Sequence, residues 1–254
     1  MESILQFAIL AILGLLGGVL AGAVGVGGAA IFIPALVYVV GWGIKDAIAA
    51  SLMITIFSSL SGTIRNAWSE DPVDWRVAAL LASTVAPASL IGVFINNISP
   101  ETVAQVTFAG LLLALSYPMA RGSSSPSEGG RKIPLSLVLV AGIGIGTLSG
   151  LVGVGGGGMT VPLMVLGFGL STKRAVSTSL AVTLCTGTVA SIGYITTGFG
   201  DFLSLPPLIV GSILGPLLGV RLREWLPEKA IRVGFAGFMV VVALRTLGSA
   251  TGIL

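Results

Sequence analysis

Two glycine clusters are the parts of this sequence whose residue types and spacing best suit the binding of a ligand. The first spans residues 25–28 and the second spans residues 153–158, and a short apolar run follows each of them. Glycine adopts backbone conformations that other residues avoid, and it lets backbone N–H groups approach a ligand without a Cβ in the way. A helix that begins after such a cluster starts with unpaired N–H groups at the positive end of its dipole. The clusters therefore predict a site for an anion that needs no lysine or arginine.

The alternative interpretation of the clusters is structural, because glycines also allow two membrane helices to cross at close range. The pairing of the clusters, each with a short helix after it, favours the binding site. The glycines expected to line this site are Gly25, Gly27, Gly28, Gly153, Gly155, Gly156 and Gly157.

A stripe of hydroxyl side chains in the next apolar segment of each half adds candidate hydrogen-bond donors. The spacing i, i+4, i+7 places the members of a stripe on one face of a helix. Both stripes are candidate ligands of the anion: Ser51, Thr55 and Ser58 in the first half, and Ser179, Thr183 and Thr186 in the second. Serine and threonine in membrane helices also bond to neighbouring helices or to carbonyl groups of their own helix, and the sequence leaves both roles open.

The chain lacks the side chains on which most enzymes and metal sites depend. It has no histidine and one cysteine, which excludes histidine-based metal sites, catalytic triads and proton relays. No carboxylate falls inside an apolar run, so the usual carrier of a proton through a membrane is missing. We therefore expect no enzyme activity, no metal and no cofactor. The coupling ion, a proton or sodium, stays open, since backbone carbonyls can also bind sodium.

Composition places the chain in a membrane. Hydrophobic residues make up 54% of its 254 residues and charged residues 9%, whereas soluble domains carry about 25% charged residues. So few charges cannot cover a soluble globule, which excludes a soluble enzyme and a nucleic-acid-binding module. We expect an all-α integral membrane protein of about ten hydrophobic helical segments. These nearly charge-free segments, five in each half, are residues 4–23, 29–41, 47–64, 77–98 and 102–120, and then 133–152, 158–169, 175–197, 202–220 and 230–250.

The chain contains an internal repeat at a shift of 128 residues. The shift aligns the two glycine clusters, and it also aligns Pro34 with Pro162. Repeats of this kind indicate two copies of one structural unit. We therefore divide the chain into a first transmembrane repeat at residues 1–120, a polar linker at 121–132 and a second transmembrane repeat at 133–254.

The positive charges indicate how the two repeats lie in the membrane. If the chain reverses direction at each glycine cluster, one face collects all of the 13 Lys and Arg residues except Lys45 and Arg245. If each cluster only kinks a continuous helix, the cations divide almost evenly between the faces. The preference of lysine and arginine for the cytoplasmic side favours reversal. The repeats then have inverted topology, with both termini outside and the linker in the cytoplasm, which is typical of secondary transporters. Whether the short helices cross fully or re-enter stays open.

The sequence resembles the sulfite exporter TauE/SafE family, also called the toluene sulfonate uptake permease family. The motif G-x-x-G-V-G-G-x-x-x-x-x-P occurs from Gly22 to Pro34 and again from Gly150 to Pro162. The stretches KDAIAASLMIT and KRAVSTSLAVT after the two motifs are similar to the family's pattern as well. The resemblance covers essentially the whole chain. It implies an inner-membrane permease for sulfur-containing or carboxylate organic anions.

The residues and the resemblance together predict a secondary transporter that works by alternating access. The resemblance implies its substrates, which are small sulfur-containing anions such as sulfite, thiosulfate, sulfoacetate or other sulfonates. An anion channel and a transporter of carboxylates are the alternatives. The expected partners are the anion, the lipid bilayer of a bacterial inner membrane and a coupling ion. We expect no nucleic acid, and a homo-oligomer stays open.

The predicted topology can be tested by labelling a cysteine placed in the linker. In Ser124→Cys, a membrane-impermeant thiol reagent should react from the cytoplasmic side, because the charge bias places residues 121–132 there. Intact cells and inside-out vesicles give the two sides for comparison. Labelling in intact cells, with none in inside-out vesicles, would overturn the topology.

Overall fold

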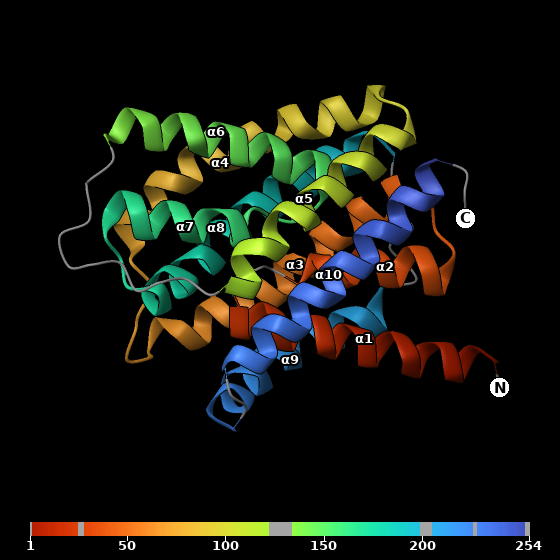
Figure 1. Cartoon of the computed structure of the whole chain (residues 1–254), viewed down its shortest axis with the longest axis horizontal. Helices are drawn as coiled ribbons and strands as arrows, with labels where there is room; N and C mark the ends of the chain where they lie inside the picture. The colour runs from red at the N-terminus through yellow and green to blue at the C-terminus, as the bar shows by residue number, and fades with distance from the viewer. Residues whose placement is uncertain (1, 25–27, 122–133, 199–204, 226–227, 252–254) are drawn as a thin grey trace.

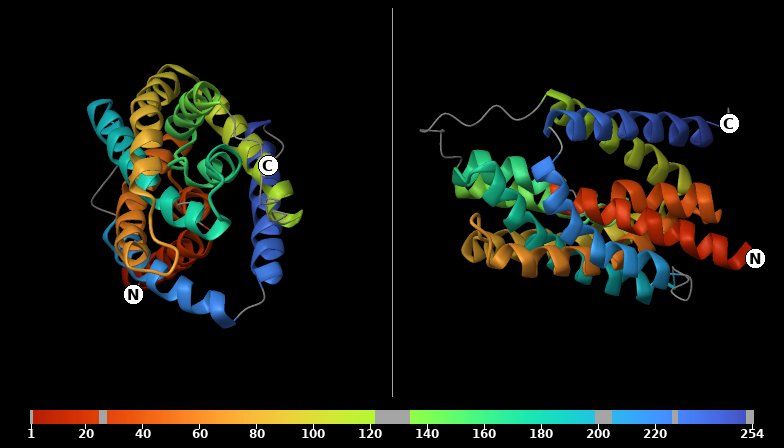
Figure 2. Two further views of the ribbon diagram at one scale, coloured as in Figure 1. Left: turned by 90° about the vertical axis from the view of Figure 1, so that its left-hand side faces the viewer. Right: turned by 90° about the horizontal axis from the view of Figure 1, so that it is seen from below.

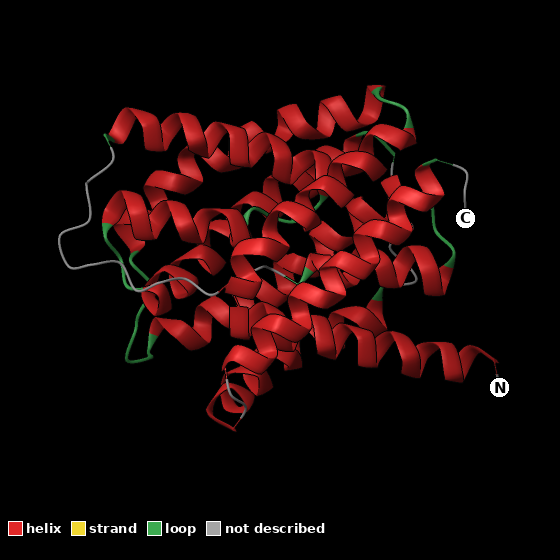
Figure 3. Cartoon of the chain, viewed as in Figure 1, coloured by secondary structure: helices red, strands yellow, loops and turns green. Residues whose placement is uncertain are grey.

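The structure, a computed structural model, describes residues 2–24, 28–121, 134–198, 205–225 and 228–251 (Figure 1). This part of the chain is helical almost throughout, with short turns and no strand (Figure 3). Its elements are α1 (Glu2–Val24), α2 (Ala29–Ala35), η1 (Leu36–Val40), α3 (Ile44–Ala67), α4 (Trp75–Ile98), α5 (Glu101–Arg121), α6 (Leu135–Val152), α7 (Gly157–Phe168), α8 (Thr172–Thr196), α9 (Pro206–Trp225) and α10 (Glu228–Ala250). The expected all-α class is confirmed.

Helix length and apolar composition fit a chain that crosses a membrane several times. Five described helices are long and apolar enough to span a bilayer: Ile44–Ala67, Trp75–Ile98, Leu135–Val152, Thr172–Thr196 and Val233–Ala250. Four shorter apolar helices accompany them: Phe7–Ala21, Ala29–Val40, Gly157–Phe168 and Pro206–Leu218. At 1.5 Å per residue, the 12 residues of α7 reach only about 18 Å, against about 30 Å of hydrocarbon. Such a helix is shorter than the apolar layer is thick.

Glycines with left-handed backbone conformation form the breaks at both clusters. α6 ends at Gly153, whose φ is 79°, and α7 begins after Gly156, whose φ is 77°. α2 begins after Gly28, whose φ is 74°. Residues with a Cβ rarely adopt these angles, which explains why glycine occupies the breaks. A short helix follows each cluster as expected, although α2 passes after seven residues into the π-helical η1, whereas α7 stays α-helical.

The chain turns back on itself at each cluster. Figure 1 shows α7 running back toward the end of the bundle at which α6 begins. In the same way α2 and η1 run back toward the end at which α1 begins. The end of α3 and the starts of α4 and α8 lie together at one end of the bundle, and α1 and α3 begin at the other end.

Helices of the two halves pack in matching pairs. α1 packs along α9, and α6, the counterpart of α1 in the repeat, packs along α4, the counterpart of α9. α3 lies against α8, and α5 lies beside α10 at one edge of the molecule (Figure 2). α3 and α8 are counterparts of each other in the repeat, and so are α5 and α10. All of these contacts connect the first half of the chain with the second.

Glycines at four-residue spacing bring two of the pairs into backbone contact. In the α4–α6 pair, a Cβ on Gly146 would lie 2.8 Å from the Cβ of Ala88. In the α1–α9 pair, a Cβ on Gly18 would lie 2.9 Å from the Cα of Gly215. Only glycine fits at such distances. Close helix crossing, the alternative considered for the glycine clusters, is therefore the role of these helical glycines.

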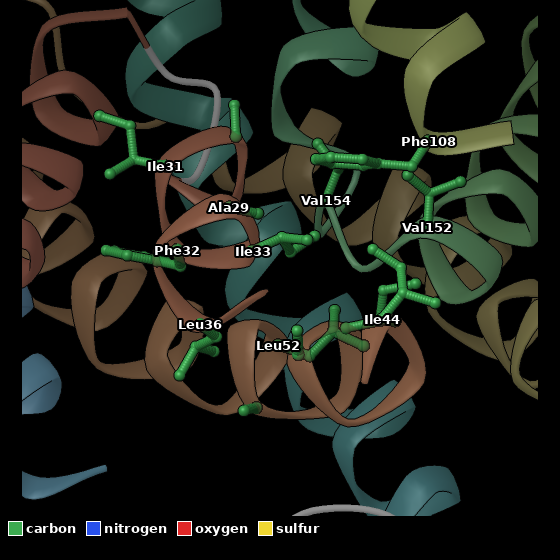
Figure 4. Packing of buried hydrophobic residues seen from close by; sticks show 14 of the residues in the cluster. Ala29, Ile31, Phe32, Ile33, Leu36, Ile44, Leu52, Phe108, Val152 and Val154 are labelled. Carbon is green, nitrogen blue, oxygen red and sulfur yellow. The ribbon is translucent and has the colours of Figure 1, made fainter. Parts of the chain in front are cut away.

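Two apolar clusters fill the interior of the bundle. The smaller one contains residues of α4, α6, α7 and α8, and the larger one contains residues of every described helix except α7. Val154, from the second glycine cluster, belongs to the larger one, and Figure 4 shows it near Ile33 of α2 and Phe108 of α5. Val154 thus packs the second glycine cluster against helices of the first half.

The close crossing of α4 and α6 predicts opposite effects for two neighbouring glycines. Gly146→Ala should lower the melting temperature in detergent, because overpacking costs about 1–3 kcal/mol. Gly144→Ala is the control, since a Cβ there meets nothing within 4 Å, and alanine favours a helix over glycine by about 1 kcal/mol. Equal melting temperatures for the two variants would contradict the backbone contact.

Candidate functional site

The second glycine cluster lies between the two helices that carry the hydroxyl stripes. A Cβ on Gly155 would lie 2.8 Å from Cγ2 of Thr183 and 3.2 Å from Cγ2 of Thr55. A Cβ on Gly153 would lie 2.8 Å from Oγ of Ser51. The structure therefore brings predicted site residues of both halves together at the break between α6 and α7.

Thr55 and Thr183 lie halfway along their helices. Each is the twelfth residue of its helix, in the 24 residues of α3 and the 25 residues of α8. Both threonines and Gly155 are buried. α3 and α8 are long and apolar enough to span a bilayer, and the midpoint of a helix that does so lies near the middle of the hydrocarbon layer. We refer to Thr55, Gly155 and Thr183 as the midpoint site.

Three hydroxyls of the stripes are engaged within the protein. Ser51 donates to the carbonyl of Ile48 at 2.8 Å and to the carbonyl of Gly153 at 3.0 Å. Ser179 and Thr186 donate to carbonyl groups in the preceding turn of α8, at 2.8 Å and 2.9 Å. Bonding to helix carbonyls, the structural role that the sequence left open, therefore accounts for these three side chains.

Ser58 and Thr183 differ from the other members of the stripes. Their hydroxyl oxygens are buried and have no hydrogen-bond partner in the part of the chain that the structure describes. Leaving a buried hydroxyl unpaired costs about 1–3 kcal/mol. A ligand that offers an acceptor atom to the Thr183 hydroxyl would relieve this cost, although the side of Thr183 that faces Gly155 is its methyl group.

Two residues that the sequence analysis did not single out hold the end of α6. Asn96 of α4 donates Nδ2 to the carbonyl of Leu151 at 2.7 Å, and Tyr194 of α8 donates its hydroxyl to the carbonyl of Gly150 at 2.8 Å. Both side chains are buried, and the last carbonyls of a helix lack donors within the helix. The sequence does carry a signal for Asn96, because an amide inside the apolar run 77–98 is costly unless it is bonded.

The other predicted glycines lie farther from the stripes or outside the described chain. Gly25 and Gly27 fall outside the described residues. Gly28 packs against α1, since a Cβ there would lie 2.7 Å from a backbone oxygen of that helix. A Cβ on Gly156 would approach side chains of α4 and α6 no closer than 3.5 Å. Gly157 is buried and is the first residue of α7.

Charged side chains lie away from the midpoint site. None is among the buried residues that the structure describes, and within the same residues no three His, Cys, Asp or Glu side chains could together hold a metal ion. Charged contacts occur at helix ends, where Arg174 pairs with Asp74 at 3.2 Å and Lys45 donates to the carbonyl of Ser99 at 2.6 Å. Neutral donors would have to hold an anion at the midpoint site.

The bond from Ser51 to the glycine cluster predicts a loss of stability on its removal. Ser51→Ala should destabilise the protein by about 1–3 kcal/mol, because a buried carbonyl loses its donor. Ser83→Ala is the control, since Ser83 is exposed and donates only within α4, to the carbonyl of Leu80 at 2.8 Å. Thermal unfolding in detergent measures both variants, and equal shifts would argue against a structural role of the Ser51–Gly153 bond.

Comparison with known proteins extends the argument to the whole chain. The family model described as sulfite exporter TauE/SafE matches residues 10–246. The chain is 30% identical to a probable membrane transporter protein of Haemophilus influenzae, over 92% of this chain and 95% of that protein. It is 27% identical to the probable membrane transporter protein YunE of Bacillus subtilis, over 89% of this chain and 92% of that protein. No solved structure matches the chain. The chain therefore belongs to the TauE/SafE family of membrane transporters.

Proposed function

We propose that this protein is a secondary transporter that moves a small sulfur-containing anion across a bacterial inner membrane by alternating access. Sulfite, thiosulfate, sulfoacetate and other sulfonates are the proposed substrates, and the family description supports this class. The observation that carries the proposal is the buried, unpartnered hydroxyl of Thr183, a residue whose methyl group lies against Gly155.

The midpoint site combines donors that suit an oxyanion in an apolar layer. Burying an anion without compensation is prohibitively costly, so the site needs several donors. The hydroxyl of Thr183 is one of them. α7 begins at Gly157, two residues after Gly155, and its first N–H groups lie at the positive end of the helix dipole. The missing Cβ of Gly155 makes room for the methyl groups of the two threonines, so both side chains lie close to the start of α7.

The burial of the midpoint site favours a transporter over an open channel. Thr55, Gly155 and Thr183 are all buried, so the described conformation is closed on both sides of the site. A transporter passes through such a closed state between its inward-facing and outward-facing states. An open anion channel would instead keep a continuous polar path past these residues.

The arrangement of the helices supports two repeats of inverted topology. The chain turns back at each glycine cluster (Figure 1). The helix pairs of the two halves also match, because α1 packs along α9 and their counterparts α6 and α4 pack along each other. Reversal also agrees with the topology predicted from the sequence, in which most lysines and arginines lie on one face of the membrane. Two halves of matching structure and opposite orientation allow alternating access around a site between them.

A binding screen combined with one isosteric substitution tests the function. Sulfite, thiosulfate and sulfoacetate should each be compared with a carboxylate of similar size by thermal shift in detergent, because a specific ligand raises apparent stability. Thr183→Val removes the hydroxyl and keeps the shape of the side chain. It should weaken binding about 10- to 100-fold, since a hydrogen bond to a charged ligand is worth about 1.5–3 kcal/mol. The folded state should lose no stability.

The matched control is a threonine whose hydroxyl is engaged. Thr246 is buried in α10 and donates to the carbonyl of Val242 at 2.8 Å. Thr246→Val should therefore lower stability and leave binding unchanged, which is the opposite pattern. Normal binding by Thr183→Val would place the anion elsewhere. Binding of carboxylates alone would contradict the proposed substrate class, and flux without exchange of labelled substrate would favour a channel.

A further inference from the structure

Helices α3 and α8 pack tightly against each other near the end of the bundle where α3 ends and α8 begins. A Cβ on Gly62 of α3 would lie 2.8 Å from Cδ1 of Leu180 of α8, so the glycine leaves the room that the leucine occupies. Leu180 is fully buried. It lies about one helical turn before Thr183, on the side of the α8 start. The leucine is therefore placed between the midpoint site and this end of the bundle.

Two hydroxyls on the same stretch of α3 are buried without a hydrogen bond. Ser59 and Thr63 flank Gly62 in the sequence, and their four-residue spacing puts them on one face of the helix. Both are buried, and their hydroxyl oxygens have no partner among the residues described. In the described conformation these two hydroxyls stay unsatisfied, at a cost in free energy.

We infer that Leu180 is a gate of the transport route and that Ser59 and Thr63 line the route which it closes. When Leu180 withdraws from Gly62, the two hydroxyls gain access to water and to the oxygen atoms of the passing anion. They form a transient subsite between the midpoint site and the end of the bundle at which α3 ends. The inference rests on the proposed function, and it names the residues that open one side of the site.

A contact network beside the gate ties the start of α8 to the start of α4. The carboxylate of Asp74 lies 3.2 Å from the guanidinium of Arg174, and the backbone N–H of Asp74 donates to the hydroxyl of Thr178 at 3.0 Å. Thr178 lies two residues before Leu180. The Arg174 side chain is 44% exposed, so water screens the ion pair and keeps it weak. The start of α8 is thus held by contacts that a conformational change can break.

The internal repeat supplies a matched control for the gate. The shift of 128 residues aligns Leu52 with Leu180. Leu52 is equally buried and lies about one turn before Thr55, toward the opposite end of the bundle. Leu52→Ala removes the same atoms from the core as Leu180→Ala, but at the other side of the midpoint site.

The experiment measures how fast a cysteine in the closed route reacts. Ser59→Cys is made in a Cys185→Ser background, because Cys185 is exposed. The protein is reconstituted into vesicles without substrate, and a membrane-impermeant thiol reagent is added to each side in turn. Leu180→Ala should speed the reaction from one side by at least about tenfold, which corresponds to about 1.4 kcal/mol of closure free energy. Leu52→Ala should leave the rate from that side unchanged.

The outcomes separate the gate from the function on which it rests. An unchanged rate in folded Leu180→Ala, or an equal increase in Leu52→Ala, would overturn the gate. Thermal unfolding shows whether each variant folds. If Leu180→Ala does not, the smaller change Leu180→Val takes its place and should give an increase in the same direction. The labelling needs no substrate, so its result does not depend on whether Thr183→Val binds the anion.

Discussion

A helix that ends in the buried interior of a bundle leaves backbone groups that water cannot satisfy. α6 ends in this way at the second glycine cluster, and three buried side chains meet its last carbonyls and that of Gly153. They are Tyr194, Asn96 and Ser51, which come from α8, α4 and α3. The need to satisfy one broken helix thus fixes how three neighbouring helices approach it.

The two sides of this break have opposite polarity. On the α6 side, side chains of the protein already donate hydrogen bonds to the carbonyls. On the other side, the start of α7 presents N–H groups, and nearby Thr183 has an unpartnered hydroxyl. Donors in excess favour a ligand that accepts hydrogen bonds. With no charged side chain buried among the described residues, the proposed anion would bind and leave without breaking a buried ion pair, whose loss is costly.

Close packing between the halves is the second constraint. Glycine crossings join α1 to α9 and α4 to α6, so each half is locked to the other at two corresponding places. Between these rigid pairs lie α3 and α8, which carry the midpoint site and touch at Gly62 and Leu180. Movement that opens the proposed route is therefore expected between α3 and α8, where the contact at Gly62 is made by the side chain of Leu180.

The sequence by itself determined the membrane class, the helices and the short helices after the glycine clusters, because hydropathy and the conformational freedom of glycine act locally. It also selected Gly155, Thr55 and Thr183, although it could not show that they meet. The roles of the hydroxyls needed the tertiary structure, which assigns Ser51 to the glycine cluster and leaves Thr183 unpaired. A hydroxyl can bond to its own helix, to a neighbour or to a ligand, and the choice depends on distances between helices far apart in the chain. For the same reason the carbonyls that Asn96 and Tyr194 bond to emerged only when α4, α6 and α8 were packed together.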